Sequence, residues 1–136
     1  ERMAVRLRCG VCLCVERWGS GTPLLIVSPS NTSAIEVRRQ LMRMDLWRTH
    51  ECVTYDPRGF GGSSKPDATW PIPSMEVHAD DAIELLDVLG WSSAHLLGIS
   101  YGGMIVQHVL LRCPSRVRMR GEMHIITGHC TLPLPL

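Results

Sequence analysis

The chain has 136 residues, of which 45% are hydrophobic and 20% are charged, and its 14 Lys and Arg residues nearly balance 13 Asp and Glu residues, for a formal net charge of +1. This length predicts one domain, and the composition excludes the disordered proteins of low hydrophobicity and high charge. The near-neutral charge offers no overall field to nucleic acid or an anionic membrane, so we expect neither as a partner.

The first half of the chain predicts a β-hairpin, two buried strands and one helix. Residues 3 to 8 and 11 to 17 alternate apolar and other side chains around Gly10, which permits a tight turn between two antiparallel strands. Residues 24 to 27 are a short apolar run, typical of a strand covered on both faces. Residues 33 to 46 favour a helix, and residues 52 to 55 predict the next strand.

The second half predicts helices that alternate with strands. Ser74 can cap a helix whose apolar residues recur at three- and four-residue spacing, and Gly90 ends that helix. Residues 95 to 99 predict a buried strand, residues 102 to 112 a helix that stops before Pro114, and residues 123 to 127 a further parallel strand. We therefore predict an α/β fold, in which an N-terminal β-hairpin precedes mostly parallel strands with helices on both faces.

Six cysteines are spread along the chain, and no secretory signal pattern precedes them. We therefore expect reduced thiols, a cytoplasmic location and no disulfide framework. Cys9, Cys12 and Cys14 stand close together, but a second pair of ligands does not follow, so we predict no zinc site. No apolar run approaches the roughly 20 residues that a membrane span requires, so no transmembrane helix is expected.

Residues 98 to 102 read Gly-Ile-Ser-Tyr-Gly and lie between a predicted strand and a predicted helix. In that context the pattern GxSxG is typical of a nucleophile elbow, a sharp turn that exposes a serine hydroxyl. Gly98 and Gly102 would avoid collisions with neighbouring backbone, Ser100 would be the nucleophile, and the Tyr101 N–H would donate to an oxyanion. The alternative is an ordinary tight turn that contains a serine.

A second motif, DPRGFGGS at residues 56 to 63, follows the strand predicted at residues 52 to 55. The two motifs make residues 3 to 117 resemble the N-terminal half of the α/β-hydrolase family, an incomplete core of that fold. The resemblance is to the branch that contains enol-lactonases, C–C bond hydrolases and cofactor-free haloperoxidases. We expect a structural turn in which Asp56 and Arg58 form hydrogen bonds with backbone groups and with each other. The residues assigned to this structural motif are Asp56, Arg58, Gly59 and Gly61.

The resemblance implies a triad of serine, acid and histidine in that chain order, with no cofactor and no metal. It also implies a second oxyanion donor after the strand at residues 24 to 27, where Ser30 is the candidate beside Tyr101. His129 stays open as the base, because the carboxyl end of a strand at residues 123 to 127 would neighbour the elbow. Four other histidines are not expected to act as the base. His50 and His78 are interpreted as structural residues in connecting segments. His95 and His108 are interpreted as packing or surface residues that lie too far from Ser100.

These observations predict a serine hydrolase that acts on a small ester, lactone or related acyl substrate through an acyl-enzyme on Ser100. Residues 118 to 136 depart from the family pattern and are interpreted as a divergent tail, truncated or aberrant. The triad acid and base are therefore expected to be missing, and the chain to be inactive. The alternative is a non-catalytic truncated isoform or fragment that binds at most a ligand or a partner. An incomplete sheet would expose a strand edge, which favours self-association.

Overall fold

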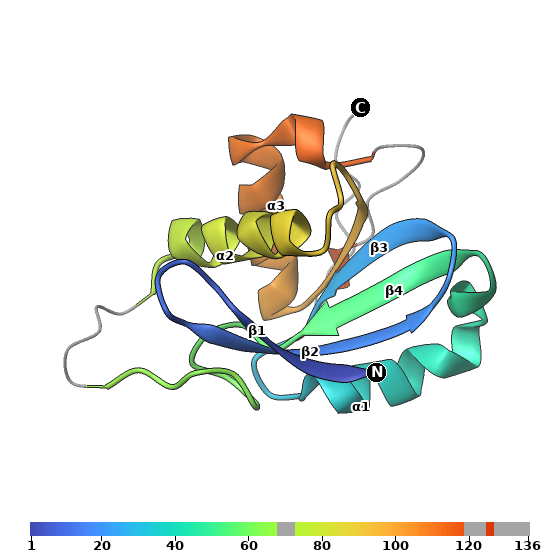
Figure 1. The fold of residues 1–136 in the computed structure, drawn as a ribbon, viewed down its shortest axis with the longest axis horizontal. Helices are drawn as coiled ribbons and strands as arrows, with labels where there is room; N and C mark the ends of the chain where they lie inside the picture. Colours follow the sequence, from blue (N-terminus) through green and yellow to red (C-terminus); the bar gives the residue numbers. More distant parts are fainter. Residues whose placement is uncertain (68–72, 119–124, 127–136) are drawn as a thin grey trace.

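A single sheet organises the protein in a computed structural model that describes residues 1–67, 73–118 and 125–126 (Figure 1). Within these residues the sheet has six strands in the order β1-β2-β4-β3-β5-β6. The strands are β1 (Arg2–Arg6), β2 (Cys12–Gly19), β3 (Thr22–Val27), β4 (His50–Tyr55), β5 (His95–Ile99) and β6 (Ile125–Ile126). The helices are α1 (Ala34–Leu41), α2 (Met75–Val88) and α3 (Tyr101–Arg112), with short 3-10 turns at Met42–Met44, Leu46–Arg48 and Pro114–Arg116.

The hairpin at the start of the chain forms the antiparallel part of the sheet. β1 pairs with β2 from Arg2 opposite Glu16 to Arg6 opposite Cys12, and Gly10 takes a φ of 88° in their connection. β2 also runs antiparallel to β4, whereas β3 is parallel to both β4 and β5, and β5 is parallel to β6. The predicted order, a hairpin followed by parallel strands and helices, is confirmed.

Helices cover both faces of the sheet (Figure 1). α1 packs on one face, where Ile26 and Val37 belong to the same apolar cluster. α2 and α3 lie together on the other face, over a larger cluster that includes Leu25 and Leu86. Successive residues of β3 thus enter opposite layers, which explains why its apolar run is uninterrupted.

The helix predicted over residues 33 to 46 is shorter than expected. α1 spans Ala34–Leu41 and is followed by two 3-10 turns. Met42 and Met44 are 39% and 62% exposed, so the apolar contacts that hold α1 on the sheet stop at its last residue. Asp45 then takes a left-handed φ of 53° between the two turns, and the chain leads back into β4.

The end of α3 leads back to the sheet. Val117 forms a parallel bridge with Ala94, and the Arg118 N–H donates to the Ala94 carbonyl oxygen at 2.8 Å. Beyond β5, β6 places Ile125 opposite Gly98. The strand predicted over residues 123 to 127 is therefore present at Ile125–Ile126, while the predicted division of the chain at residue 117 stays a prediction.

Candidate active site

Ser100 occupies the turn between β5 and α3. Its backbone takes a φ of 53° and a ψ of −115°, and the residue is exposed. In the described part of the chain, Asp45 is the one other non-glycine residue at positive φ. Such a conformation costs about 1 to 3 kcal/mol and persists only where surrounding contacts hold it. The fold therefore presents this serine to solvent on a strained turn.

Two glycines of the motif allow α3 to approach the sheet closely. A Cβ atom on Gly102 would lie 2.1 Å from the Val27 carbonyl oxygen, and one on Gly98 would lie 2.5 Å from the Gly103 Cα. Both obstructions are backbone atoms, which cannot move aside as the end of a flexible side chain can. The turn therefore requires glycine two residues before and two residues after the serine.

The backbone around Ser100 offers donors to a negatively charged oxygen. Tyr101 is the first residue of α3, so its N–H is among the helix N-terminal groups that lack an intrahelical partner. The loop after β3 also reaches this turn, because a Cβ atom on Gly102 would lie 2.9 Å from the Ser28 carbonyl oxygen. Ser30, two residues further along that loop, is exposed, and its role as the second donor stays a prediction.

Asp56 organises the loop that follows β4. Its carboxylate is buried and accepts two backbone hydrogen bonds, from the Ala34 N–H at 2.6 Å and from the Gly62 N–H at 2.8 Å. Gly59 and Gly61 take φ angles of 89° and 48°, and a Cβ atom on Gly61 would lie 2.2 Å from Asp56 Oδ2. The glycines thus let the loop wrap the carboxylate, which in turn fixes the start of α1.

Arg58 does not pair with Asp56, so the prediction that these two residues would satisfy each other is wrong. Its guanidinium instead donates two hydrogen bonds to Asp81 of α2, from Nε at 2.6 Å and from Nη2 at 2.5 Å. Asp56 already accepts backbone donors through both carboxylate oxygens, whereas the buried Asp81 offers both of its oxygens to the guanidinium. The pair ties the loop after β4 to α2.

His78 lies inside α2 rather than in a connecting segment, which corrects its predicted place. It is buried, and its Nε2 shares a hydrogen bond of 2.9 Å with the Tyr101 hydroxyl. The Phe60 ring packs edge-on against the Tyr101 ring at a centroid distance of 5.2 Å. His78 lies between Ser74 and Gly90, the predicted ends of α2, and this position was the available signal. The residue after Ser100 is therefore held by side chains from two other elements.

The remaining histidines lie elsewhere. His50 begins β4 rather than lying in a connection, and its ring is 5.9 Å from that of His95, at the opposite end of β5 from Ser100. His108 lies two turns along α3 with Nδ1 3.9 Å from a Glu76 carboxylate oxygen. Within residues 1–67, 73–118 and 125–126, no hydrogen bond joins Ser100 to a histidine. His129 lies outside the described residues.

The cysteines and acidic residues do not gather into a metal site in the described ranges. No group of three or more His, Cys, Asp or Glu residues is placed to hold a metal ion there. Among the described residues, five cysteines are free thiols: Cys9, Cys12, Cys14, Cys52 and Cys113. No described helix is both long enough and apolar enough to cross a bilayer.

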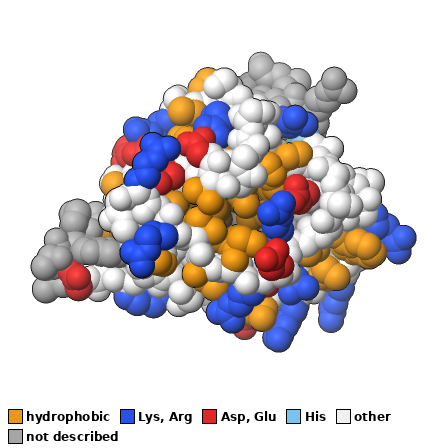
Figure 2. Space-filling model, viewed as in Figure 1, with side chains coloured by type: hydrophobic (Ala, Val, Ile, Leu, Met, Phe, Trp, Pro, Cys, Tyr) orange, Lys and Arg blue, Asp and Glu red, His pale blue; other side chains and the backbone are white. Residues whose placement is uncertain are grey.

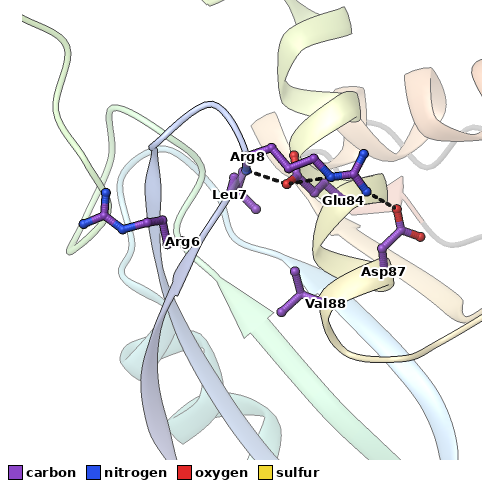
Figure 3. Close-up of a pocket in the computed structure, with 6 residues that line it drawn as sticks. All are labelled: Arg6, Leu7, Arg8, Glu84, Asp87 and Val88. Atoms are coloured by element: carbon purple, nitrogen blue, oxygen red, sulfur yellow. Dashed lines mark hydrogen bonds and ion pairs between the residues drawn. The ribbon is translucent and has the colours of Figure 1, made fainter.

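A surface pocket lies between the β1–β2 hairpin and the second half of α2, where apolar side chains gather among charged ones (Figure 2). Figure 3 shows Arg8 reaching across to Glu84 and Asp87, with Leu7 and Val88 beside it. Since a helix rises about 1.5 Å per residue, this part of α2 lies about 9 to 15 Å beyond the residue that contacts Tyr101. The pocket is therefore separate from the turn that carries Ser100.

Acidification is expected to destabilise the protein through His78. Burial, and to a smaller extent the Arg58 charge, lowers the pKa of this imidazole to about 4. In the unfolded chain a histidine titrates near 6.5, so between these values the unfolded state binds a proton that the folded state does not. The contribution of neutral His78 to the free energy of unfolding is therefore fully present above about pH 6.5. This free energy falls by roughly 3 kcal/mol by pH 4.

Urea unfolding at pH 7 and at pH 4 would measure this loss. Between pH 7 and pH 4, the free energy of unfolding of His78→Gln should fall by about 3 kcal/mol less than that of wild type, because the substitution removes the group that titrates. His108→Gln, on the partly exposed side of α3, is the matched control and should behave like wild type. An equal loss in wild type and His78→Gln would mean that other groups cause the acid lability.

The chain is similar to known proteins over most of its length. The family model for the alpha/beta hydrolase fold matches residues 34–119. Serine hydrolase BPHL of Mus musculus is 32% identical over 111 residues, which cover 80% of this chain and 38% of the relative. The 2-hydroxymuconate semialdehyde hydrolase of Pseudomonas sp. strain CF600 is 32% identical over 102 residues, which cover 74% of this chain and 35% of the relative.

A solved structure agrees with the same architecture. Est816, described as an N-acyl homoserine lactone degrading enzyme, superposes with a TM-score of 0.72 at 31% identity, and the match covers 85% of this chain and 42% of that one. The chain therefore spans less than half the length of these relatives.

Proposed function

Because the chain belongs to the alpha/beta hydrolase fold family, we propose that it carries the nucleophile of a serine hydrolase, with Ser100 as the attacking residue. The observation that carries this proposal is an exposed, non-glycine residue held at a φ of 53° between a parallel strand and a helix N-terminus. The ordinary turn at Asp45 shares the positive φ, but its ψ of 11° lies in the left-handed helical region, whereas the ψ of −115° at Ser100 lies outside it. A nucleophile gains from this strained backbone, because the turn lifts the hydroxyl away from the sheet and toward a substrate.

The reaction that fits this geometry is acyl transfer. The Ser100 Oγ attacks a carbonyl carbon while a base takes the hydroxyl proton, and the carbonyl oxygen becomes an oxyanion that accepts from the Tyr101 N–H. Ser30 is proposed as the second donor. The intermediate expels an alcohol, which takes the proton from the base, and water then releases the acid from the acyl-enzyme. This chemistry requires no cofactor and no metal.

This mechanism needs a base beside Ser100, and none of the described histidines is hydrogen-bonded to Ser100. His129 is the candidate that we propose, because it follows β6 in the sequence. β6 is parallel to β5, and the carboxyl ends of neighbouring parallel strands meet at one edge of the sheet, where Ser100 also lies.

The names of the relatives support a small acyl or related substrate. One relative is named a serine hydrolase, a second a hydrolase of a semialdehyde, and a solved structure belongs to a lactone-degrading enzyme. We propose an ester, a lactone or a related acyl compound as the substrate class. The free thiols support our proposal that the chain works in a reducing, cytoplasmic compartment.

A fluorophosphonate probe tests the nucleophile. We expect wild type to be labelled and to hydrolyse a p-nitrophenyl ester, and Ser100→Ala to do neither, because the probe bonds to the oxygen of an activated serine. Ser92→Ala, which changes an exposed serine in the connection between α2 and β5, should react like wild type. Labelling of Ser100→Ala at the wild-type rate would identify another residue as the reacting group.

A second candidate function is binding of a ligand or partner without turnover. It is favoured by the absence of a histidine bonded to Ser100 in the described ranges. Folded wild-type protein that resists the probe would support this candidate. The proposed partner can be a second copy of the chain, bound at the edge of the sheet formed by β6. Sedimentation at several concentrations would then give a mass above that of one chain.

A further inference from the structure

The strained backbone of Ser100 must be held by its surroundings, because such a conformation persists only where neighbouring contacts fix it. One restraint lies within the turn itself, where the Gly103 N–H donates to the Ser100 carbonyl oxygen at 2.8 Å. A single hydrogen bond of this kind makes only a modest net contribution to stability. The contacts of Tyr101 supply a further restraint on the helix side of the serine.

That restraint is an aromatic cluster formed by Phe60, His78 and Tyr101, which we call the elbow clamp. Phe60 comes from the loop after β4, His78 from the first half of α2, and Tyr101 from the first turn of α3. The His78 and Tyr101 rings meet edge to face at a centroid distance of 5.5 Å, and Phe60 lies 5.2 Å from Tyr101 and 6.4 Å from His78. Three elements thus converge on the residue that follows Ser100.

His78 is the unusual member of the elbow clamp, because a buried polar ring costs stability unless it is hydrogen-bonded. The residue is 2% exposed, and its Nδ1 has no hydrogen-bond partner among the described residues. The hydrogen bond between Nε2 and the Tyr101 hydroxyl is what compensates its burial. An apolar side chain would fill this space at lower cost, so the imidazole is explained by its contact with Tyr101.

We propose that His78 is a positioning residue, which acts through the elbow clamp to hold the strained Ser100 backbone and the direction of the Tyr101 N–H. This inference rests on the proposed function, because the N–H direction matters only if an oxyanion forms beside it. Tyr101 carries the donor on its backbone and the anchor on its side chain. His78 holds the Tyr101 side chain at its hydroxyl group, and Phe60 holds it along its ring. These contacts therefore restrain the first turn of α3.

Labelling rates with the fluorophosphonate probe test the clamp in the full chain. Removal of the hydrogen bond in His78→Leu or in Tyr101→Phe should slow labelling about ten- to a hundredfold, since a displacement of about 1 Å at a reacting site has effects of this size. His78→Gln offers an amide where Nε2 lies and should restore most of the rate. Val37→Ala removes buried apolar atoms under α1, on the opposite face of the sheet, and should label like wild type.

Hydrogen exchange of the Gly103 amide tests the same clamp without catalysis. Its exchange should speed up about tenfold in His78→Leu and in Tyr101→Phe, because the bond to the Ser100 carbonyl oxygen opens more often. It should stay at the wild-type rate in His78→Gln and in Val37→Ala. An unlabelled wild type would refute the proposed function, and the exchange data would still decide on the clamp. Unchanged Gly103 exchange in His78→Leu would overturn it.

Discussion

Replacing Gly102 with alanine is expected to destabilise the protein by about 3 kcal/mol and to abolish labelling of Ser100. The new Cβ atom would lie 2.1 Å from the Val27 carbonyl oxygen and 2.9 Å from that of Ser28. Both are backbone atoms at the end of β3, so α3 itself must move away from the sheet. Helix propensity alone predicts the opposite sign, because alanine is favoured over glycine within a helix by about 1 kcal/mol. Urea unfolding measures the stability, and the fluorophosphonate probe measures the state of the turn.

Gly10→Ala is the matched control for this substitution. Gly10 takes a φ of 88° in the hairpin connection, and a Cβ atom there would meet no heavy atom within 4 Å. Its cost is therefore backbone strain alone, about 1 to 2 kcal/mol, and labelling should be unaffected. If Gly102→Ala cost no more than Gly10→Ala and still reacted with the probe, the close contact between α3 and β3 would not exist in the protein.

The turn around Ser100 could be predicted from the sequence, because it depends on glycine at two fixed positions. Its signal is local: two glycines flank the serine at fixed spacing, after an apolar strand and before a helix. Other local signals also gave the right elements. The Ser74 side chain accepts from the Val77 N–H at the start of α2, and Gly90 takes a φ of 72° just after its end.

Contacts between distant segments could not be predicted in the same way. Asp81, which accepts two hydrogen bonds from Arg58, is 23 residues away, whereas Asp56 is nearer in the sequence but accepts from the backbone of Ala34 and Gly62. His78 and Tyr101 are equally far apart, and their contact depends on how α2 packs beside α3. The length of α1 depended on where its apolar contacts with the sheet stop. Each of these features is set by packing rather than by a local pattern.

Replacing Arg58 with alanine is expected to lower the free energy of unfolding by about 3 to 5 kcal/mol, because the substitution breaks a buried ion pair. Arg58 and Asp81 are 15% and 4% exposed, and the guanidinium donates two hydrogen bonds to the carboxylate. Burial is the largest influence on the Asp81 carboxyl and raises its pKa, whereas the hydrogen bonds and the charge of Arg58 lower it, so an ionised Asp81 without Arg58 would be costly. The substitution leaves that carboxyl buried without its main donor.

A double-mutant cycle in urea separates the charge pair from other effects. Arg58→Ala with Asp81→Ala should cost less than the sum of the two single variants, because no lone buried charge remains. Arg112→Ala is the matched control, since Arg112 and Asp80 form an ion pair of 2.7 Å with 42% and 57% of their side chains exposed. Its cost should stay below about 1 kcal/mol. Equal costs for Arg58→Ala and Arg112→Ala would mean that the loop after β4 does not hold Arg58 against α2, and the path of that loop beside the elbow clamp would have to be revised.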